Sequence, residues 1–433
     1  MNKTIFKQLE TIWHKGTRGL LSAGLASTML VWGGTPVQLE PTRDADLHAD
    51  RVIRTTAKAH PVAPAPSREA VRFSWPIERE TEIDLNYRSH EATSKGFRLL
   101  VRGEDFRNGI ALPLETSRAV IAINAVGEDR VALREAAIDP HDVTLVAKNG
   151  TVFRGAEGLE KLAALEDLQN ARKQQMPVAT TMFKLAGQVG SGEVMLFADN
   201  MNHDRQDRYV IQVLEKHSDV ALGLRTGRDT YLPGEPIALQ ADWLSDTSTL
   251  TTVSLEGRIV SPTGKVHPLR FDARNQLSPF TLSEREAAIA GLWRVEVTAI
   301  GDDGVRKVRR DVATAFALTE PTARFSGKAE VSLTKNALVA GLEVEVGSAG
   351  RFEARGILFG TDATGAMVPV AVAHAADWFQ PGQRLLALHF DGETLEQAAV
   401  GAPFEVRDLR LIHQDRLGLL HRQAQALRVE AID

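Results

Sequence analysis

The strongest constraint on the fold is a period-two alternation of apolar and polar residues between positions 219 and 320. The alternating runs are residues 237–244, 253–260 and 293–298. Such alternation places one face of a strand on a core and the other in solvent, as in an antiparallel sheet. Turn-forming residues at 233–234, 262–264 and 302–304 separate the runs. We therefore predict a β-sandwich over residues 219–320, with Trp243 and Trp293 in its core.

The regions on either side are also rich in predicted strands. Residues 321–433 repeat the alternation, for example at Leu342, Val344 and Val346, and predict a second sandwich. Residues 71–218 give mixed signals. Apolar and β-branched runs predict strands at 97–101, 109–114, 119–125, 195–198 and 209–214. Residues near 156–175 are rich in Ala, Leu, Glu and Lys and predict a helix. The predicted fold is mainly β: a β-rich N-terminal domain with one helix, followed by two sandwich domains.

The first 70 residues predict an export signal followed by a flexible linker. Lys3, Lys7, Lys15 and Arg18 precede an uncharged apolar run at 19–34, which is short for a membrane span. We interpret 1–35 as a signal peptide, with a buried helix or an uncleaved anchor as the alternative. Residues 36–70 contain few large apolar side chains and several prolines, so they predict a flexible linker. An exported protein, periplasmic or secreted, with no stable transmembrane span in its mature chain, is the expected result.

Composition and charge exclude several classes of function. The chain has 51 Lys and Arg against 56 Asp and Glu, a formal net charge of −5, which argues against a nucleic-acid partner. The absence of cysteine excludes disulfides, thiolate metal sites, cysteine nucleophiles and lipid attachment at a cysteine. Four basic residues at 306–310 are flanked by acidic ones. We interpret them as an exposed strand protected from edge pairing rather than as a nucleic-acid surface.

No motif completes a catalytic, cofactor or metal site. In the polar loop at 199–208, an EF-hand counted from Asn200 would need glycine at Arg205 and an acid at Ile211, so only a looser cation site stays open. Residues 187–192 are glycine-rich but lack the lysine of a phosphate loop, and predict a turn. The C-terminal histidines His374, His389, His413 and His421 have no zinc spacing. His413 shares the parity of Leu409 and Leu411, which predicts a partly buried histidine with a hydrogen-bond partner. We assign no catalytic, cofactor-binding or metal residues, and expect no cofactor.

A resemblance adds to this picture. The segment DTYLPGEPIALQADW at 229–243 resembles the opening of immunoglobulin-like modules in bacterial surface and macroglobulin-type proteins. The segments at 291–318, 350–365, 376–391 and 402–416 together resemble an exported bacterial family of unknown function. That family has an N-terminal domain followed by two immunoglobulin-like domains. The resemblance covers roughly residues 75–425 and implies fold and export, but it implies no catalytic residues.

These observations favour a non-enzymatic exported protein that binds an unknown protein or glycan partner. Whether the chain is an enzyme stays open, but the lack of a complete catalytic motif favours a protein without enzymatic activity. One alternative is a secreted hydrolase whose site lies in residues 71–218, which would require a deep polar cleft with paired carboxylates or a Ser–His contact. Another is a macroglobulin-like inhibitor or a periplasmic assembly factor, which rests on analogy with the Tyr-x-x-Gly module alone.

Overall fold

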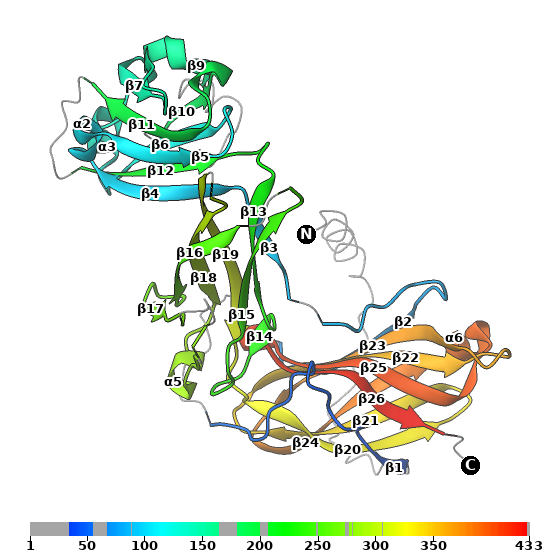
Figure 1. The fold of residues 1–433 in the computed structure, drawn as a ribbon. Helices are drawn as coiled ribbons and strands as arrows, with labels where there is room; N and C mark the ends of the chain where they lie inside the picture. The colour runs from blue at the N-terminus through cyan, green and yellow to red at the C-terminus, as the bar shows by residue number, and fades with distance from the viewer. Residues whose placement is uncertain are drawn as a thin grey trace.

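The three domains are nested along the chain. The first domain is inserted within the middle domain, and the middle domain is inserted within the C-terminal domain. The computed structural model describes residues 34–54, 67–87, 89–163, 180–199, 207–247, 250–272, 277–278, 280–304 and 306–430. The chain starts in the C-terminal domain, crosses to the middle domain, builds the first domain and then returns through both. Figure 1 shows the first and middle domains stacked end to end, with the C-terminal domain extending away at an angle.

The first domain (residues 96–214) is a sandwich of two antiparallel sheets. Its larger sheet has the order β4-β12-β6-β10-β9 and its smaller sheet the order β5-β11-β7-β8. The strands are β4 (Gly96–Arg102), β5 (Ile110–Leu114), β6 (Val120–Val126), β7 (Val143–Val146), β8 (Val152–Arg154), β9 (Leu159–Ala163), β10 (Thr180–Leu185), β11 (Gly192–Ala198) and β12 (Arg208–Leu214). The helices are α2 (Asp105–Asn108) and α3 (Arg130–Glu135), with 3-10 turns η1 (Pro140–Asp142), η2 (Gly155–Gly158) and η3 (Gly187–Val189).

The middle domain (residues 92–94 and 220–318) is also a two-sheet sandwich. Its sheets have the orders β15-β13-β3 and β14-β19-β18-β16-β17. The elements are β3 (Ala92–Ser94), β13 (Val220–Thr226), β14 (Thr230–Tyr231), β15 (Leu239–Ser245), β16 (Thr251–Val260), β17 (Val266–Leu269), α5 (Glu284–Ala287), β18 (Leu292–Asp302) and β19 (Lys307–Leu318). Because β3 precedes the first domain in sequence, this sandwich is closed only after the first domain has been made.

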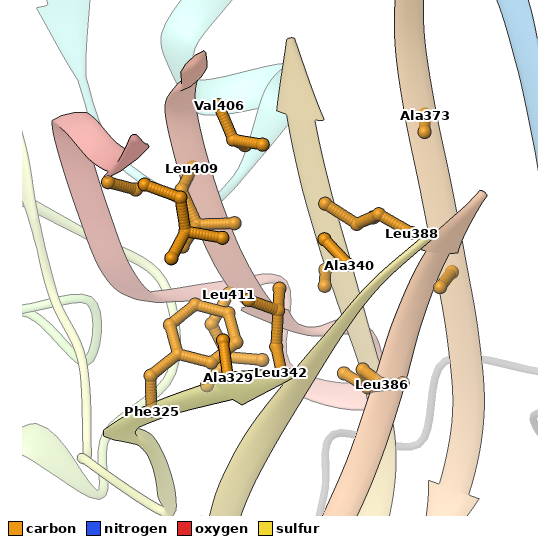
Figure 2. Packing of buried hydrophobic residues seen from close by; sticks show 14 of the residues in the cluster. Phe325, Ala329, Ala340, Leu342, Ala373, Leu386, Leu388, Val406, Leu409 and Leu411 are labelled. Atoms are coloured by element: carbon orange, nitrogen blue, oxygen red, sulfur yellow. The ribbon is translucent and has the colours of Figure 1, made fainter. Parts of the chain in front are cut away.

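The C-terminal domain (residues 35–76 and 323–429) has the longest strands. Its sheets have the orders β1-β20-β21-β24 and β2-β23-β22-β25-β26. The elements are β1 (Thr35–Gln38), β2 (Val71–Pro76), β20 (Ala323–Leu333), β21 (Ala337–Val346), β22 (Gly350–Thr361), β23 (Met367–Phe379), β24 (Gly382–Asp391), α6 (Gly392–Ala398), β25 (Gly401–His413), the turn η4 (Gln414–Arg416) and β26 (Gly418–Val429). Figure 2 shows side chains from strands of both sheets meeting in its core, among them Phe325, Leu342 and Leu411.

The prediction of a flexible linker over 36–70 is wrong where the structure describes it. Residues 35–38 pair with β20, so they supply an edge strand to one sheet of the C-terminal domain. Residues 71–76, which the sequence placed at the start of the N-terminal domain, pair with β23 and supply an edge strand to the other sheet, so the boundary at 71 is also wrong. Between them, Leu47 is buried and its backbone pairs with that of Arg422. Strand addition uses backbone N–H and C=O groups, which every sequence carries. A segment poor in large apolar side chains can therefore be ordered. Residues 55–66, with the three alternating prolines, and residues 1–33 lie outside the described residues.

Two further expectations change in the structure. Residues 159–163 form strand β9 after the turn η2, so the helix expected near 156–175 is wrong over its first part; residues 164–175 lie outside the described residues. Val253 is exposed, because a bulge between Thr252 and Ser254 shifts the register by one residue. Such a shift exchanges the two faces of a strand. Thr252 faces inward instead and accepts a hydrogen bond from Trp243 Nε1 at 3.1 Å.

The alternation elsewhere predicts burial correctly. Trp293, Val295 and Val297 are buried in the middle domain, and Trp243 packs partly buried against the same cluster. In the C-terminal domain Leu342, Val344 and Val346 are buried. The predicted strand at 109–114 corresponds to β5, which contains Pro113 and ends its sheet. A proline at a sheet edge removes no ladder hydrogen bond.

A buried ion cluster joins the first and middle domains. Arg310 on β19 and Glu215, which follows β12, are both fully buried, with Nη1 and Oε2 2.8 Å apart. The same guanidinium donates to Ser218 Oγ at 2.8 Å and to the Val220 carbonyl at 3.1 Å. Glu215 Oε1 accepts from the backbone N–H groups of Glu115 and Thr116, each at 2.7 Å. The interpretation of 306–310 as an exposed basic strand is therefore wrong at Arg310.

Replacement of Arg310 tests how much this cluster stabilises the junction. In Arg310→Met, Glu215 keeps its buried position without a cation, and removing one partner of a buried pair costs roughly 3–5 kcal/mol. We expect that loss in the unfolding transition of the first and middle domains, measured by urea denaturation of the full chain. The control is Lys307→Ala, an exposed position on the same strand, which should change stability by less than about 0.5 kcal/mol. Equal stability of Arg310→Met and the wild type would contradict a stabilising role.

Candidate functional site

A cavity lies where the middle domain meets the C-terminal domain. Its volume is about 310 Å³, within the range that small-molecule ligands occupy. We call it the junction cavity. Its middle-domain wall comes from the segment between α5 and β18 and from the end of β19; its C-terminal wall comes from the end of β25, η4 and the start of β26. The apolar lining includes Ala287, Ala290, Leu292, Ala317, Leu318, Leu417 and Leu420.

The charged side chains of the cavity each have a polar partner. Arg416 Nη1 donates to Glu320 Oε2 at 2.6 Å, across the segment that links the two domains. Asp415 Oδ2 accepts from the backbone N–H of Arg351 at 3.0 Å, which anchors η4 to strand β22. These contacts leave a pocket with apolar walls and a few fixed polar groups, the usual composition of a binding site.

His413 forms the buried end of this wall. Its side chain is 2% exposed, and Nδ1 shares a hydrogen bond of 2.8 Å with Thr322 Oγ1. Nε2 lies 3.7 Å from Asp415 Oδ2, and a Cβ on Gly350 would stand only 2.2 Å from Nε2, so the ring requires glycine there. Burial lowers the pKa of His413 to about 4, against the raising effect of Asp415. The sequence predicted a partly buried histidine with a hydrogen-bond partner; the partner is confirmed, and the ring is more deeply buried than predicted.

The row Thr322–His413–Asp415 resembles a hydrolytic triad in residue types but not in access. The hydroxyl of Thr322 is fully buried, and the Nε2 edge of His413 is packed against Gly350. A nucleophile has to reach a substrate carbonyl in an open cleft. The arrangement therefore fixes the cavity wall rather than forming a catalytic centre. The cavity also lies outside residues 71–218, where the hydrolase alternative placed its site.

Two exposed leucines border the cavity. Leu417 is 84% exposed and Leu292 is 65% exposed, and both line the pocket. Leu417 has a φ of 51°, in the left-handed region that L-residues with a Cβ disfavour. Because Leu417 is exposed, its side chain gains no free energy from burial, and its backbone conformation is strained. The stability of the turn therefore does not explain why a leucine stands at this position. Strain of this kind concentrates at functional sites.

The other residues singled out by sequence do not form a site. Residues 200–206 of the polar loop lie outside the described residues, while Asp199 accepts a hydrogen bond from Thr144. Residues 187–189 form the predicted turn, η3, before strand β11. His374 and His421 bond to Glu353 and Gln423 respectively. In the described part of the chain, no group of three or more His, Asp or Glu could hold a metal ion, and no helix could cross a membrane.

One sequence feature at the junction cavity lies outside the alternating apolar pattern. A leucine directly before Gly418 at a hairpin end is unusual, because glycine or asparagine is favoured at left-handed turn positions. The other wall could not be foreseen, since it depends on how two domains meet.

The burial of His413 predicts a pH dependence of stability. Its pKa in the folded protein, about 4, is below the usual value of 6.5, so the unfolded state binds the proton more tightly. Its contribution to stability is complete above pH 6.5 and is lost as the pH falls towards 4, by about 3 kcal/mol in total. Urea denaturation of the wild type and of His413→Gln between pH 7 and 4 should show a smaller pH slope in the variant. Parallel pH profiles for the two proteins would contradict the assignment.

Comparison with known proteins places these domains in one family. The model of the DUF4785 N-terminal domain, a domain of unknown function, matches residues 62–215, and the model of the DUF4785 C-terminal domain matches residues 322–430. No curated protein matches the chain. The match over 62–215 includes β2 and β3, which the structure places in the C-terminal and middle domains.

A solved structure agrees with this placement. A DUF4785 family protein from Legionella pneumophila has the same fold, with a TM-score of 0.68 and 19% identity, over 89% of this chain and 99% of that chain. A Salmonella alpha-2-macroglobulin mutant (TM-score 0.19, 10% identity, 89% of this chain and 24% of that chain) and a DUF3823 family protein from Parabacteroides merdae (TM-score 0.17, 12% identity, 43% and 94%) are too dissimilar to support an argument. Because the two models together match more than half of its length, this chain belongs to the DUF4785 family of unknown function.

Proposed function

We propose that this chain is a non-enzymatic binding protein that acts outside the cytoplasm, and that its ligand places an apolar group in the junction cavity. The observation that carries the proposal is the cavity together with its exposed leucine border. Exposed apolar groups beside a preformed pocket are typical of binding sites, because they gain burial only when a ligand arrives.

The chemistry of the cavity favours an amphiphilic ligand with an apolar body. The alanines and leucines of both walls would enclose that body, and burying apolar surface supplies the main free energy of binding. The Glu320–Arg416 pair lies at the same pocket and offers hydrogen-bonding groups to a polar end. Because the two walls belong to different domains, a bound ligand would also strengthen the contact between them.

Leu417 provides a direct test, because its effects on stability and on binding should be opposite. In Leu417→Asn the residue tolerates a positive φ, so stability should stay equal or rise by up to about 1 kcal/mol. The same change removes apolar surface from the border of the cavity and should weaken binding several-fold. The probe is the amphiphilic dye 1-anilinonaphthalene-8-sulfonate, followed by fluorescence titration of the folded full chain.

Two further variants complete this experiment. Ala290→Trp places an indole in the cavity and should abolish the saturable dye signal. Leu333→Ala, at an exposed leucine outside the cavity, should leave the dye affinity unchanged. Undiminished dye binding by Ala290→Trp would show that the cavity is not the site. Turnover of an ester, peptide or glycan by the purified protein would instead favour the hydrolase alternative.

Export is proposed on the N-terminal sequence, where four basic residues precede the apolar run at 19–34. Fractionation of bacteria that express the full chain with a C-terminal tag should recover a shortened form outside the cytoplasm. Deletion of residues 19–34 should retain the protein inside. A full-length wild-type protein found only in the cytoplasm would overturn this part of the proposal.

A further inference from the structure

Three aromatic rings form a cluster on the outer face of the C-terminal domain, away from the junction cavity's lining. We call it the aromatic cluster: Phe73 and Trp75 of β2 and His374 of β23. Phe73 lies opposite His374 in the strand register, and Trp75 is two residues further along the same face. Each ring centroid is 5.1–5.3 Å from the other two, and the ring planes agree within 12–23°. The rings therefore form a triangular group of nearly parallel planes rather than a single column.

The cluster exposes a large apolar area. Phe73 is 44% exposed and Trp75 is 47% exposed, and Val71 is exposed on the same strand. Strand β2 is the terminal strand of its sheet, so these side chains stand at the border of the sheet face. Aromatic side chains supply the largest apolar contact area of any residue type. Two half-exposed aromatic side chains therefore indicate a surface that a ligand covers.

A row of hydrogen bonds holds the third ring in place. His374 Nδ1 lies 2.6 Å from Glu353 Oε1, and Gln414 Nε2 donates to Glu353 Oε2 at 2.6 Å. Arg351 Nε donates in turn to Gln414 Oε1 at 2.7 Å, so the row crosses from β23 through β22 to η4. Although burial raises the pKa of Glu353, the hydrogen bonds from His374 and Gln414 hold it below its usual value. An ionised carboxylate can only accept, so Nδ1 of His374 donates to Glu353 and Nε2 takes no part in this row.

The surroundings of the cluster carry balanced charge. Arg68, Arg351 and Arg355 lie beside the cluster, against Glu69, Glu353 and Asp408. The face of nearby Trp378 is already covered by the guanidinium of Arg68, 4.4 Å from the ring centroid. A basic excess that would attract an anionic lipid surface is missing among these six side chains. Planar hydrogen-bonding groups therefore lie next to partly exposed aromatic rings.

From these observations we propose that the aromatic cluster binds the pyranose rings of a glycan. One face of a pyranose carries C–H groups, which pack on the electron-rich face of an aromatic ring. Its hydroxyls need planar donors and acceptors beside that ring, and the histidine–glutamate–glutamine row supplies both. A protein partner would need a much wider apolar core than three rings provide. The glycan site is independent of the proposed function, because its residues do not line the junction cavity.

The test uses the full chain and three soluble probes: cellohexaose, chitohexaose and laminarihexaose. Isothermal titration should show saturable binding of at least one of them to the wild type. Trp75→Ala should weaken that binding about tenfold, the effect of losing roughly 1.4 kcal/mol of ring contact. Because Trp75 is half exposed, the variant should keep the melting temperature of the wild type within a few degrees.

Two control variants show whether a loss of binding is specific to the aromatic cluster. Leu385→Ala, at an exposed leucine on the other sheet of the same domain, should bind the probe like the wild type. Leu417→Asn should also bind it normally, so failure of the cavity proposal and failure of this one are distinguishable. Absence of binding to all three probes, or equal affinity of Trp75→Ala and the wild type, would overturn the proposal. Loss of self-association by Trp75→Ala in sedimentation velocity, without any glycan binding, would assign the cluster to a second copy of the chain instead.

Discussion

The structure depends on backbone hydrogen bonds between the two ends of the chain. Strands β1 and β2 complete the two sheets of a domain whose other strands begin only at Ala323, the first residue of β20. Everything between, including two whole sandwiches, is a loop closed by those pairings. Closing a loop costs entropy that rises only slowly with its length, so such an arrangement is thermodynamically accessible. Because strands β20 to β26 are the last in sequence, the sheets of the C-terminal domain can be completed only after the other two domains have been synthesised.

Crossing each domain junction twice restricts how the domains can move. At the first junction, Glu215 donates its backbone N–H to the Lys95 carbonyl, and Lys95 Nζ donates to the Ser218 carbonyl, so the outgoing and returning chains bond to each other. The Arg310 cluster lies beside them. At the second junction, Arg422 pairs with Asp229 at 3.1 Å and covers the ring of Tyr87 at 4.1 Å. Two covalent connections with polar contacts at each junction favour a fixed angle between neighbouring domains over a free hinge.

The sequence predicts the sandwiches well and their connections poorly, for a physical reason. Alternation reports which side chains face a core, and at Trp293 or Val344 that information is local to one strand. The strands β1, β2 and β3 are short, and their partners lie far along the chain, so no local pattern shows them. Val253 illustrates the same limit on a smaller scale, because the bulge that turns it outward is a property of strand pairing. The junction cavity combines both difficulties: its walls come from two domains, and only the strained Leu417 could have marked it.

The nested path also accounts for the gathering of the candidate binding features on the C-terminal domain. The aromatic cluster exists because β2 pairs at the edge of a C-terminal sheet with its large side chains exposed, although the sequence placed residues 71–76 in the N-terminal domain. The junction cavity exists because η4 and the start of β26 meet the end of the middle domain beside the linking residues 319–322. The aromatic cluster therefore requires the N-terminal segment together with the C-terminal sheets, and the junction cavity requires the middle domain together with the C-terminal domain. A fragment that began after residue 76 would lack Phe73 and Trp75 and would leave two sheet edges unpaired, which are common sites of aggregation.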